Sequence, residues 1–164
     1  MQPIKLKAAG TEDLETVAAL ARLIWNQHYP SIIGQKQIDY MLGKMYNRES
    51  LLEQIQVKHH RFYLVEACEK TIGFVSLHQE DKNNWFIPKF YIDQTIAGKG
   101  YGTMVFKELL QLTRANCFRL TVNRQNFKAI NFYFKLGFKI EKVADFDIGD
   151  GYVMNDFVMV WLKV

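Results

Sequence analysis

The chain has 164 residues, of which 49% are apolar and 23% are charged, a composition typical of soluble globular proteins. This length suits one domain with a sizeable core, so we expect residues 1–164 to form a single domain. The formal net charge of +4, from 21 basic and 17 acidic residues, falls short of the concentrated basic surface that a nucleic-acid partner requires.

The first third of the sequence predicts one strand and three helices. Alternating apolar residues indicate a strand at Ile4–Ala8. Thr11 is a typical N-cap residue, so we expect a helix to begin there and to end, or be interrupted, at Pro30. Further helices are expected at Gln35–Tyr46 and Glu49–His59.

The rest of the chain alternates between apolar strands and amphipathic helices. We expect a β-hairpin, a strand, a helix, a strand, a helix with Gly137 as its C-cap, and two closing strands around a turn-rich stretch at Asp145–Gly151. The expected ranges are, in order, Arg61–Ala67, Thr71–Gln79, Trp85–Ile92, Thr103–Arg114, Phe118–Val122, Phe127–Leu136, Lys139–Val143 and Phe157–Lys163.

This order of elements predicts an α+β fold, with a mixed, mainly antiparallel sheet of about seven strands flanked by helices. One right-handed β-α-β crossover is expected around the glycines that follow Ile92.

Membrane and metal partners find no support in the sequence. Met1–Lys7 is not a basic segment followed by an apolar run, and no apolar run approaches the length of a membrane span. We therefore expect no membrane partner and a cytoplasmic location. Cys68 and Cys117 lack metal-ligand spacing, so we also expect no metal. Two buried thiols are favoured, and a disulfide between them is kept as the alternative.

Residues 90–103 are the most informative segment, because a short apolar strand runs into three glycines and then directly into a helix. The glycines stand at alternate positions, Gly98, Gly100 and Gly102. Glycines let the backbone turn tightly, so that successive N–H groups and the positive end of a helix point at an anion. The segment therefore predicts a site for a phosphate-bearing ligand, with a ligand-free tight turn as the alternative.

A second pattern follows at residues 126–138, where Asn126, Ala129, Tyr133 and the pair Gly137-Phe138 are spaced along a helix. Together the two segments resemble the GCN5-related N-acetyltransferase (GNAT) family. Its acyl-CoA motif is written (Arg/Gln)-x-x-Gly-x-(Gly/Ala), and its second motif Asn-x-x-Ala-x-x-x-Tyr-x-x-x-Gly-Phe. The resemblance covers nearly all of the chain and is strongest between residues 87 and 138.

The resemblance implies an enzyme that moves an acetyl group from acetyl-CoA, its cosubstrate, to a primary amine of a small molecule or a protein. Direct attack within a ternary complex is expected. In this family the strands matching Trp85–Ile92 and Phe118–Val122 are parallel and splay apart, and the acyl thioester lies in the gap. Exposed closing strands often mediate dimers in this family, so a homodimer is a further expectation.

Cofactor-binding positions also follow from the resemblance. The main chain of Phe90, Tyr91 and Ile92 would pair with the pantetheine amides, and Asn126 would contact the cofactor from the second motif. The pyrophosphate would meet the loop and the helix start, at Ala97, Gly98, Lys99, Gly100, Tyr101, Gly102 and Thr103. Ala97 replaces the family's Arg or Gln, so one side-chain anchor is missing.

Tyr133 is the expected catalytic residue, because a phenol beside the thioester can protonate the departing CoA thiolate. The alternative for Tyr133 is a packed core tyrosine. Asn126 has an alternative as well, an N-cap without ligand contact, and its two roles can coexist.

The general base and the acceptor are not identified. No carboxylate lies on the strands around the glycine loop, and Glu80 or His78 would have to act through a chain of waters. The region that lines the acceptor side in the family holds Trp25, His28, Tyr29 and Tyr40. For each of them alone, a role as a core or surface aromatic is favoured over a role in binding the acceptor. Four acids precede the last strand, Asp145, Asp147, Asp150 and Asp156, where turn roles are favoured over attraction of a cationic amine.

Two other functions compete with acetyl transfer. A CoA-binding sensor or interaction domain without turnover is favoured by Ala97 and by the absent carboxylate, and opposed by Tyr133. A nucleotide-binding protein is disfavoured because Gly100 is followed by Tyr101, which leaves no Gly-Lys-(Ser/Thr) ending for a metal-bound phosphate.

Overall fold

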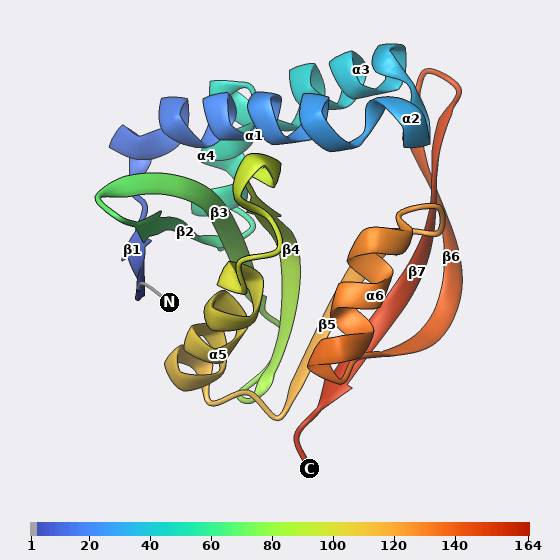
Figure 1. Cartoon of the computed structure of the whole chain (residues 1–164). Helices are drawn as coiled ribbons and strands as arrows, with labels where there is room; N and C mark the ends of the chain where they lie inside the picture. The colour runs from blue at the N-terminus through green and yellow to red at the C-terminus, as the bar shows by residue number, and fades with distance from the viewer. Residues whose placement is uncertain (1–2) are drawn as a thin grey trace.

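The computed structural model describes residues 3–164, which form a seven-stranded sheet with helices on both faces (Figure 1). The strand order is β1-β2-β3-β4-β5-β7-β6, and of these pairs only β4–β5 is parallel within the described chain. This confirms the predicted mixed, mainly antiparallel sheet with its β-α-β crossover. The strands are β1 Ile4–Ala8, β2 Arg61–Ala67, β3 Lys70–Gln79, β4 Asn84–Ile92, β5 Cys117–Asn123, β6 Lys139–Gly149 and β7 Tyr152–Leu162.

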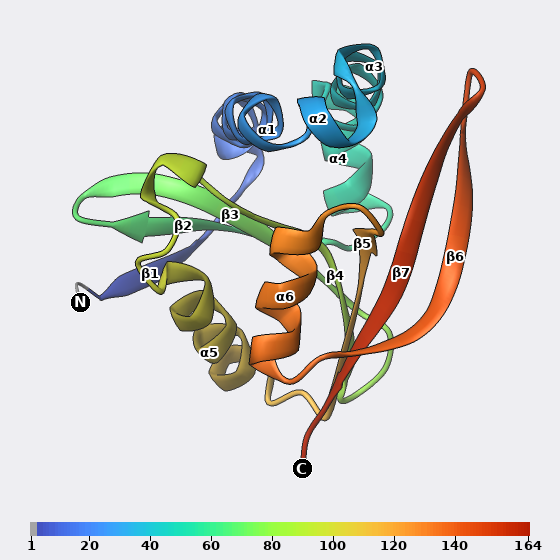
Figure 2. The same cartoon turned by 45° about the vertical axis from the view of Figure 1, so that its right-hand side comes forward.

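Helices cover the two faces of the sheet separately (Figure 2). α1, α3 and α4 bury Val17, Ile38 and Leu51 against one face, whereas α5 and α6 bury Leu109 and Ile130 against the other. The helices are α1 Leu14–His28, α2 Pro30–Ile33, α3 Gln35–Met45, α4 Arg48–Gln56, α5 Tyr101–Thr113 and α6 Phe127–Leu136, with 3-10 turns η1 Thr11–Asp13 and η2 Gln94–Ile96.

The parallel strands β4 and β5 pair over only a short length. Their register runs from Asn84 opposite Cys117 to Phe86 opposite Arg119, and no pairing follows between Ile87 and Ile92. The two strands diverge toward their carboxyl ends in Figure 1. The splayed arrangement expected for the strands around the glycine loop is therefore present.

A register shift between β3 and β4 decides which way β4 presents its side chains. The shift lies between Ser76 and His78. Before it, Ile87 packs in the cluster under α5 and α6, whereas Tyr91, four residues later, packs in the cluster under α1 and α3. Since strand side chains alternate with a period of two, this change of face requires the extra residue of a β-bulge.

The start of the first helix differs from the sequence prediction. Thr11 is not an N-cap, since η1 precedes α1 and is capped by Gly10, whose N–H donates to the Asp13 carboxylate at 3.0 Å. Asp13 competes successfully with Thr11 because its side chain reaches back three residues. The prediction for Pro30 is confirmed, because α1 ends at His28 and Pro30 begins the short helix α2.

The closing hairpin is much longer than the sequence predicts. Asp145–Gly151 is not a turn-rich stretch, because β6 continues to Gly149 and the turn consists of Asp150 and Gly151, with φ of 51° and 78°. The acids there alternate with Phe146 and Ile148, which is a strand pattern, and pairing with β7 outweighs the turn preference of Asp. The hairpin thereby reaches the candidate site.

The described residues also bear on the expectations for a membrane, a metal and the two cysteines. None of the helices in residues 3–164 is long and apolar enough to cross a membrane. Over the same residues, no group of three or more His, Cys, Asp and Glu side chains is arranged to hold a metal ion. Cys117 is buried, but Cys68 is exposed in the β2–β3 turn, so the expectation of two buried thiols is wrong for Cys68.

Candidate active site

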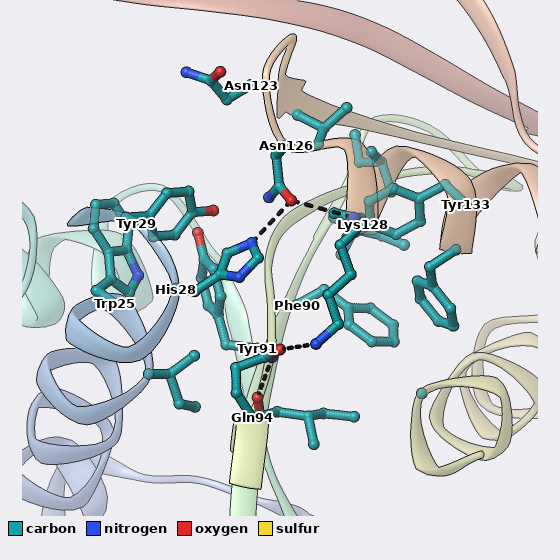
Figure 3. A pocket seen from close by; sticks show the side chains of 18 of the residues that line it. Trp25, His28, Tyr29, Phe90, Tyr91, Gln94, Asn123, Asn126, Lys128 and Tyr133 are labelled. Carbon is teal, nitrogen blue, oxygen red and sulfur yellow. Dashed lines mark hydrogen bonds between the residues drawn. The ribbon is translucent and has the colours of Figure 1, made fainter. Parts of the chain in front are cut away.

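A cavity of about 560 Å³ lies where β4 and β5 separate, with walls from both faces of the sheet. This volume is within the range of small-molecule sites. Figure 3 shows Trp25 and Tyr29 on one side and Tyr133 of α6 on the other, with Phe90 of β4 between them. Most residues expected at the site line this one cavity: Phe90, Tyr91, Ile92, Ala97, Gly98, Gly100, Tyr101, Gly102, Thr103, Asn126 and Tyr133. The side chain of Lys99 is exposed and is not part of the lining.

The glycine loop ends in the N-terminus of α5, which begins at Tyr101, two residues earlier than the sequence predicts. Gly98 and Gly100 have φ of 82° and 78°, a conformation that other residues adopt only with strain. A Cβ on Gly98 would meet nothing within 4 Å, so the space in front of the loop is open. The first amides of α5 have no acceptor within the helix, and they suit an anion such as a pyrophosphate.

Gly102 is required for a different reason, the close approach of two helices. A Cβ at this position would lie 2.7 Å from Cζ of Phe132 on α6. Lys128 and Lys135 of α6 line the same end of the cavity, and Lys128 Nζ donates to Gln94 Oε1 at 2.7 Å. Two lysines and a helix N-terminus make this end electropositive.

The edge of β4 facing the gap presents unpaired main-chain groups. The Asp93 N–H donates to the Ile72 carbonyl of β3 at 2.8 Å. Because successive residues in a strand direct their main-chain groups to opposite edges, Phe90 and Ile92 direct theirs into the gap, while those of Tyr91 face β3. Ile92 accepts a bond from Gln94 Nε2 at 2.9 Å, as this orientation requires. The geometry thus favours main-chain contacts from Phe90 and Ile92, and a side-chain contribution from Tyr91.

Tyr133 lies on α6 with only 8% of its surface exposed, inside a group of aromatic rings. Its ring centroid is 5.3 Å from that of Phe132, 5.5 Å from that of Phe138 and 6.3 Å from that of Phe90. Burial raises the pKa of the Tyr133 phenol above its ordinary value, with a smaller contribution from Tyr29. The phenol is therefore protonated at neutral pH and can donate a proton or a hydrogen bond.

Asn126 is the N-cap of α6, as one of its two expected roles requires. Its Oδ1 accepts from the Ala129 N–H at 3.2 Å and lies 2.8 Å from His28 Nε2. Since Oδ1 can only accept, Nε2 of His28 carries the proton and donates to it. The contact ties α1 to α6 across the cavity, and both side chains line it (Figure 3).

The opposite end of the cavity is aromatic and apolar. The ring centroid of Trp25 is 4.8 Å from that of Tyr29 and 5.9 Å from that of Tyr91. Burial raises the pKa of Tyr29 to about 12, so its phenol also stays protonated. The remaining apolar lining at this end consists of Ile24, Met41, Met45, Phe146, Ile148 and Met154. Tyr40 is not among the described residues that line the cavity, and its hydroxyl donates to the Ile148 carbonyl at 2.7 Å.

A carboxylate in the cavity is the main difference from the sequence expectation. Asp156 lies on β7 opposite Asn123 of β5, is 4% exposed, and belongs to the cavity lining. Glu80 and His78, the candidates for a remote base, are not in the lining, and Glu80 lies 3.9 Å from Arg119 on the surface. The sequence signal that could have indicated this is the alternation of apolar and polar residues at 143–148. It predicts a longer hairpin, in which Asp156 is part of a strand that faces the site.

Comparisons with known proteins agree with this geometry. The family model described as Acetyltransferase (GNAT) family matches residues 18–138. The spermidine N(1)-acetyltransferase of Thermoplasma acidophilum is 29% identical over 95% of each chain. The solved PaiA N-acetyltransferase of Thermoplasma acidophilum, in complex with coenzyme A, is 26% identical, with a TM-score of 0.81 over 98% of this chain and 99% of that one. A peptidyl-lysine N-acetyltransferase of Salmonella typhimurium, YjaB, is 31% identical over 55% of this chain and 58% of that protein.

The resemblance stated from the two sequence motifs is therefore confirmed, together with the fold that it implied. The family match covers residues 18–138, which include the glycine loop, the splayed strands and the helix that carries Tyr133. The chain belongs to the GNAT acetyltransferase family.

Proposed function

We propose that this chain transfers the acetyl group of acetyl-CoA to a primary amine of a polyamine. Membership of the GNAT family makes it an acyltransferase that acts on an amine. One observation supports the proposal above all others. A single cavity joins an electropositive loop with a helix N-terminus at one end to an aromatic, carboxylate-bearing pocket at the other. Tyr133 lies in the lining between them.

The cofactor end fits acetyl-CoA by its donors. The amides of Tyr101, Gly102 and Thr103 and the cations of Lys128 and Lys135 suit the pyrophosphate. The main-chain groups of Phe90 and the N–H of Ile92 suit the amides of the pantetheine arm, which would lie along β4 like an added strand. Acetyl-CoA supplies the activated acetyl group, and an N–H of this edge would polarise its carbonyl.

Tyr133 is proposed as the acid of the reaction. Its phenol is buried, protonated at neutral pH and part of the cavity wall, so it can give a proton to the sulfur as the carbon–sulfur bond breaks. Neither Cys68 nor Cys117 is among the described residues that line the cavity. The amine is therefore proposed to attack directly in a ternary complex rather than through an acetylated cysteine.

A polyamine suits the acceptor end because it combines ammonium groups with short methylene chains. Met41, Met45 and Met154 offer adaptable apolar contacts to the methylenes, and Trp25 and Tyr29 offer ring faces to a cation. The relative from Thermoplasma acidophilum that matches nearly the whole chain is a spermidine N(1)-acetyltransferase. Spermidine is therefore the first acceptor to test.

A lysine side chain on a protein is the second candidate acceptor. It too is a primary amine on a methylene chain, and the YjaB relative acts on peptidyl-lysine, although it matches only 55% of this chain. A polyamine is preferred because the spermidine enzyme matches 95% of this chain, against 55% for YjaB.

The proposal extends to the organisation of the chain. We propose that residues 1–164 act as one catalytic domain, since both halves contribute walls to the same cavity, and that it works in the cytoplasm as the sequence suggests. A homodimer is proposed through β6, a sheet-edge strand that exposes Ile140 and Val143. Sedimentation velocity measures this directly, and a monomer at all concentrations would refute it.

The experiment that tests the function has two parts. Calorimetry measures binding of acetyl-CoA, with ATP and NAD as controls, and thiol release then measures turnover with spermidine, spermine, putrescine and a lysine peptide. Acetyl-CoA binding with turnover of spermidine supports the proposal. Turnover of the peptide alone would favour the protein acceptor, and binding without turnover of any amine would favour a CoA sensor.

A further inference from the structure

Asp156 is the only carboxylate among the described residues that line the cavity. It stands on β7 directly across from Asn123 of β5, so the two side chains share a face of the sheet. Met154, two residues earlier on β7, lies on the same face and lines the apolar end of the cavity. Asp156 thus lies in the acceptor end, away from the glycine loop.

The carboxylate is buried without a full set of partners. Only 4% of Asp156 is exposed, and its Oδ1 has no hydrogen-bond partner. Arg124 does not neutralise it, since the Arg124 guanidinium is bound to Asp145 at 2.8 Å. A buried carboxylate without a cation is unfavourable, and an orphaned oxygen on a side chain that lines a cavity indicates a ligand with donors and positive charge.

The titratable and charged groups around Asp156 come from three elements. Tyr29 lies at the end of α1, Arg124 follows β5, and Asp145 belongs to β6. Burial raises the pKa of Asp156 to about 6, against a hydrogen bond from Thr121 and the charge of Arg124, which lower it. The group is therefore mainly ionised at pH 7, yet titrates close enough to neutrality to accept a proton.

We infer that Asp156 binds the ammonium group of the acceptor and takes the proton that must leave before nitrogen can attack. The inference rests on the proposed function. It supplies the base that the strands around the glycine loop lack, from the strand β7 instead. A carboxylate at the end of an apolar pocket also selects a cationic amine over a neutral compound of the same shape.

Each proton of the reaction can be assigned a donor and an acceptor. An N–H proton of the ammonium moves to the Asp156 carboxylate, which leaves a lone pair on the nitrogen. That lone pair forms the carbon–nitrogen bond to the acetyl carbon, the carbon–sulfur bond breaks, and the sulfur takes the phenolic proton of Tyr133. A second proton from the nitrogen returns to the Tyr133 oxygen through water, and Asp156 releases its proton to solvent as the amide leaves.

The test replaces Asp156→Asn, which keeps the shape and removes the charge. Asp150→Asn is the matched control, because it makes the same change in charge at the exposed hairpin turn. For D156N we expect kcat/KM with spermidine to fall about 100-fold or more, and the loss of activity around pH 6 in the wild-type profile to disappear. Spermidine binding to the CoA-loaded protein, measured by calorimetry, should weaken at least tenfold. D150N should match the wild type in all three.

Acetyl-CoA affinity and thermal stability distinguish a role of Asp156 in the reaction from a purely structural role. Acetyl-CoA affinity and thermal stability of D156N should stay at or above wild-type level, because an unpaired buried charge is removed. A D156N protein with kcat/KM within threefold of wild type overturns the inference and leaves the proposed function intact. A D156N protein that also loses stability or acetyl-CoA affinity assigns Asp156 a structural role and overturns it too. If the wild type acetylates no amine, the proposed function fails and the inference with it.

Discussion

Gly98→Glu is the sharpest perturbation of the cofactor end, because the chain offers a matched partner for it. Gly98 and Gly151 have φ of 82° and 78°, and a Cβ at either position would meet nothing within 4 Å. A glutamate at either position costs the same backbone strain, about 1–2 kcal/mol. At this chain length both variants should lose about 2–8 °C in Tm.

The two variants differ only in what the new carboxylate faces. At position 98 it would stand about 6 Å from one pyrophosphate charge, which costs about 3 kcal/mol at an effective dielectric constant of about 20. That energy corresponds to an affinity for acetyl-CoA reduced by about 100-fold. At position 151, in the β6–β7 turn, the carboxylate has no such neighbour in the proposed complex, so the affinity should be unchanged.

Calorimetric titration with acetyl-CoA, at two salt concentrations, measures the difference. Because the predicted effect is electrostatic, the loss in Gly98→Glu should shrink as salt is raised. Gly98→Ala supplies the strain without the charge and should bind nearly as well as the wild type. Equal affinities for Gly98→Glu and Gly151→Glu, with equal losses in Tm, would refute the assignment of the glycine loop to the pyrophosphate.

Three further substitutions test other parts of the molecule. Tyr133→Phe removes the proposed acid, so kcat should fall about 100-fold in the thiol-release assay while the Kd for acetyl-CoA stays within twofold; an unchanged kcat would exclude the role. Ala97→Arg restores the anchor that the family's motif carries and should tighten acetyl-CoA binding about tenfold by calorimetry, and no gain would mean that no anchor is missing. Lys89→Met should raise the free energy of unfolding at pH 7 by about 1–2 kcal/mol in urea titrations, since it removes a buried cation.

The sequence predicts the sheet and the cofactor end because both depend on local signals. Alternation of apolar residues sets each strand, and Phe127–Leu136 matches α6 at both ends, with Asn126 and Gly137 as its caps. Gly98 and Gly100 need a backbone that other residues avoid, so their spacing indicates a loop shape directly. Such signals lie within a few residues of the feature that they specify.

The acceptor end depends on long-range pairing, which a local pattern does not reveal. Asp156 enters the cavity only because β7 pairs with β5 in a register that places it opposite Asn123. The β-bulge in β4 likewise changes which face Lys89 and Tyr91 occupy, and Pro88, between the paired positions Phe86 and Lys89, is its one local sign. In both cases the register between distant strands decides which side chains meet.

Lys89 shows the consequence of that bulge most clearly. Its side chain is 5% exposed, and its Nζ donates to Gln54 Oε1 at 2.6 Å and lies 5.4 Å from the ring centroid of Tyr46. Burial lowers the pKa of Lys89 from 10.5 to about 8, with a smaller contribution from Lys58. Below pH 8 the folded protein therefore carries a buried cation, at a cost of about 3 kcal/mol relative to the unfolded chain.

The sign of the pH dependence follows from these two pKa values. Between pH 8 and pH 10.5 the folded state releases the Lys89 proton while the unfolded chain keeps it, so wild-type stability rises across this window. Lys89→Met removes the cost of about 3 kcal/mol but leaves Gln54 Oε1 without its donor, at about 1–2 kcal/mol. The variant should therefore be more stable than the wild type at pH 7 and less stable above pH 10.5. Lys58→Met, which removes an exposed cation, should not reverse in this way, and a constant difference between wild type and Lys89→Met from pH 7 to pH 11 would show that Lys89 is not a buried cation.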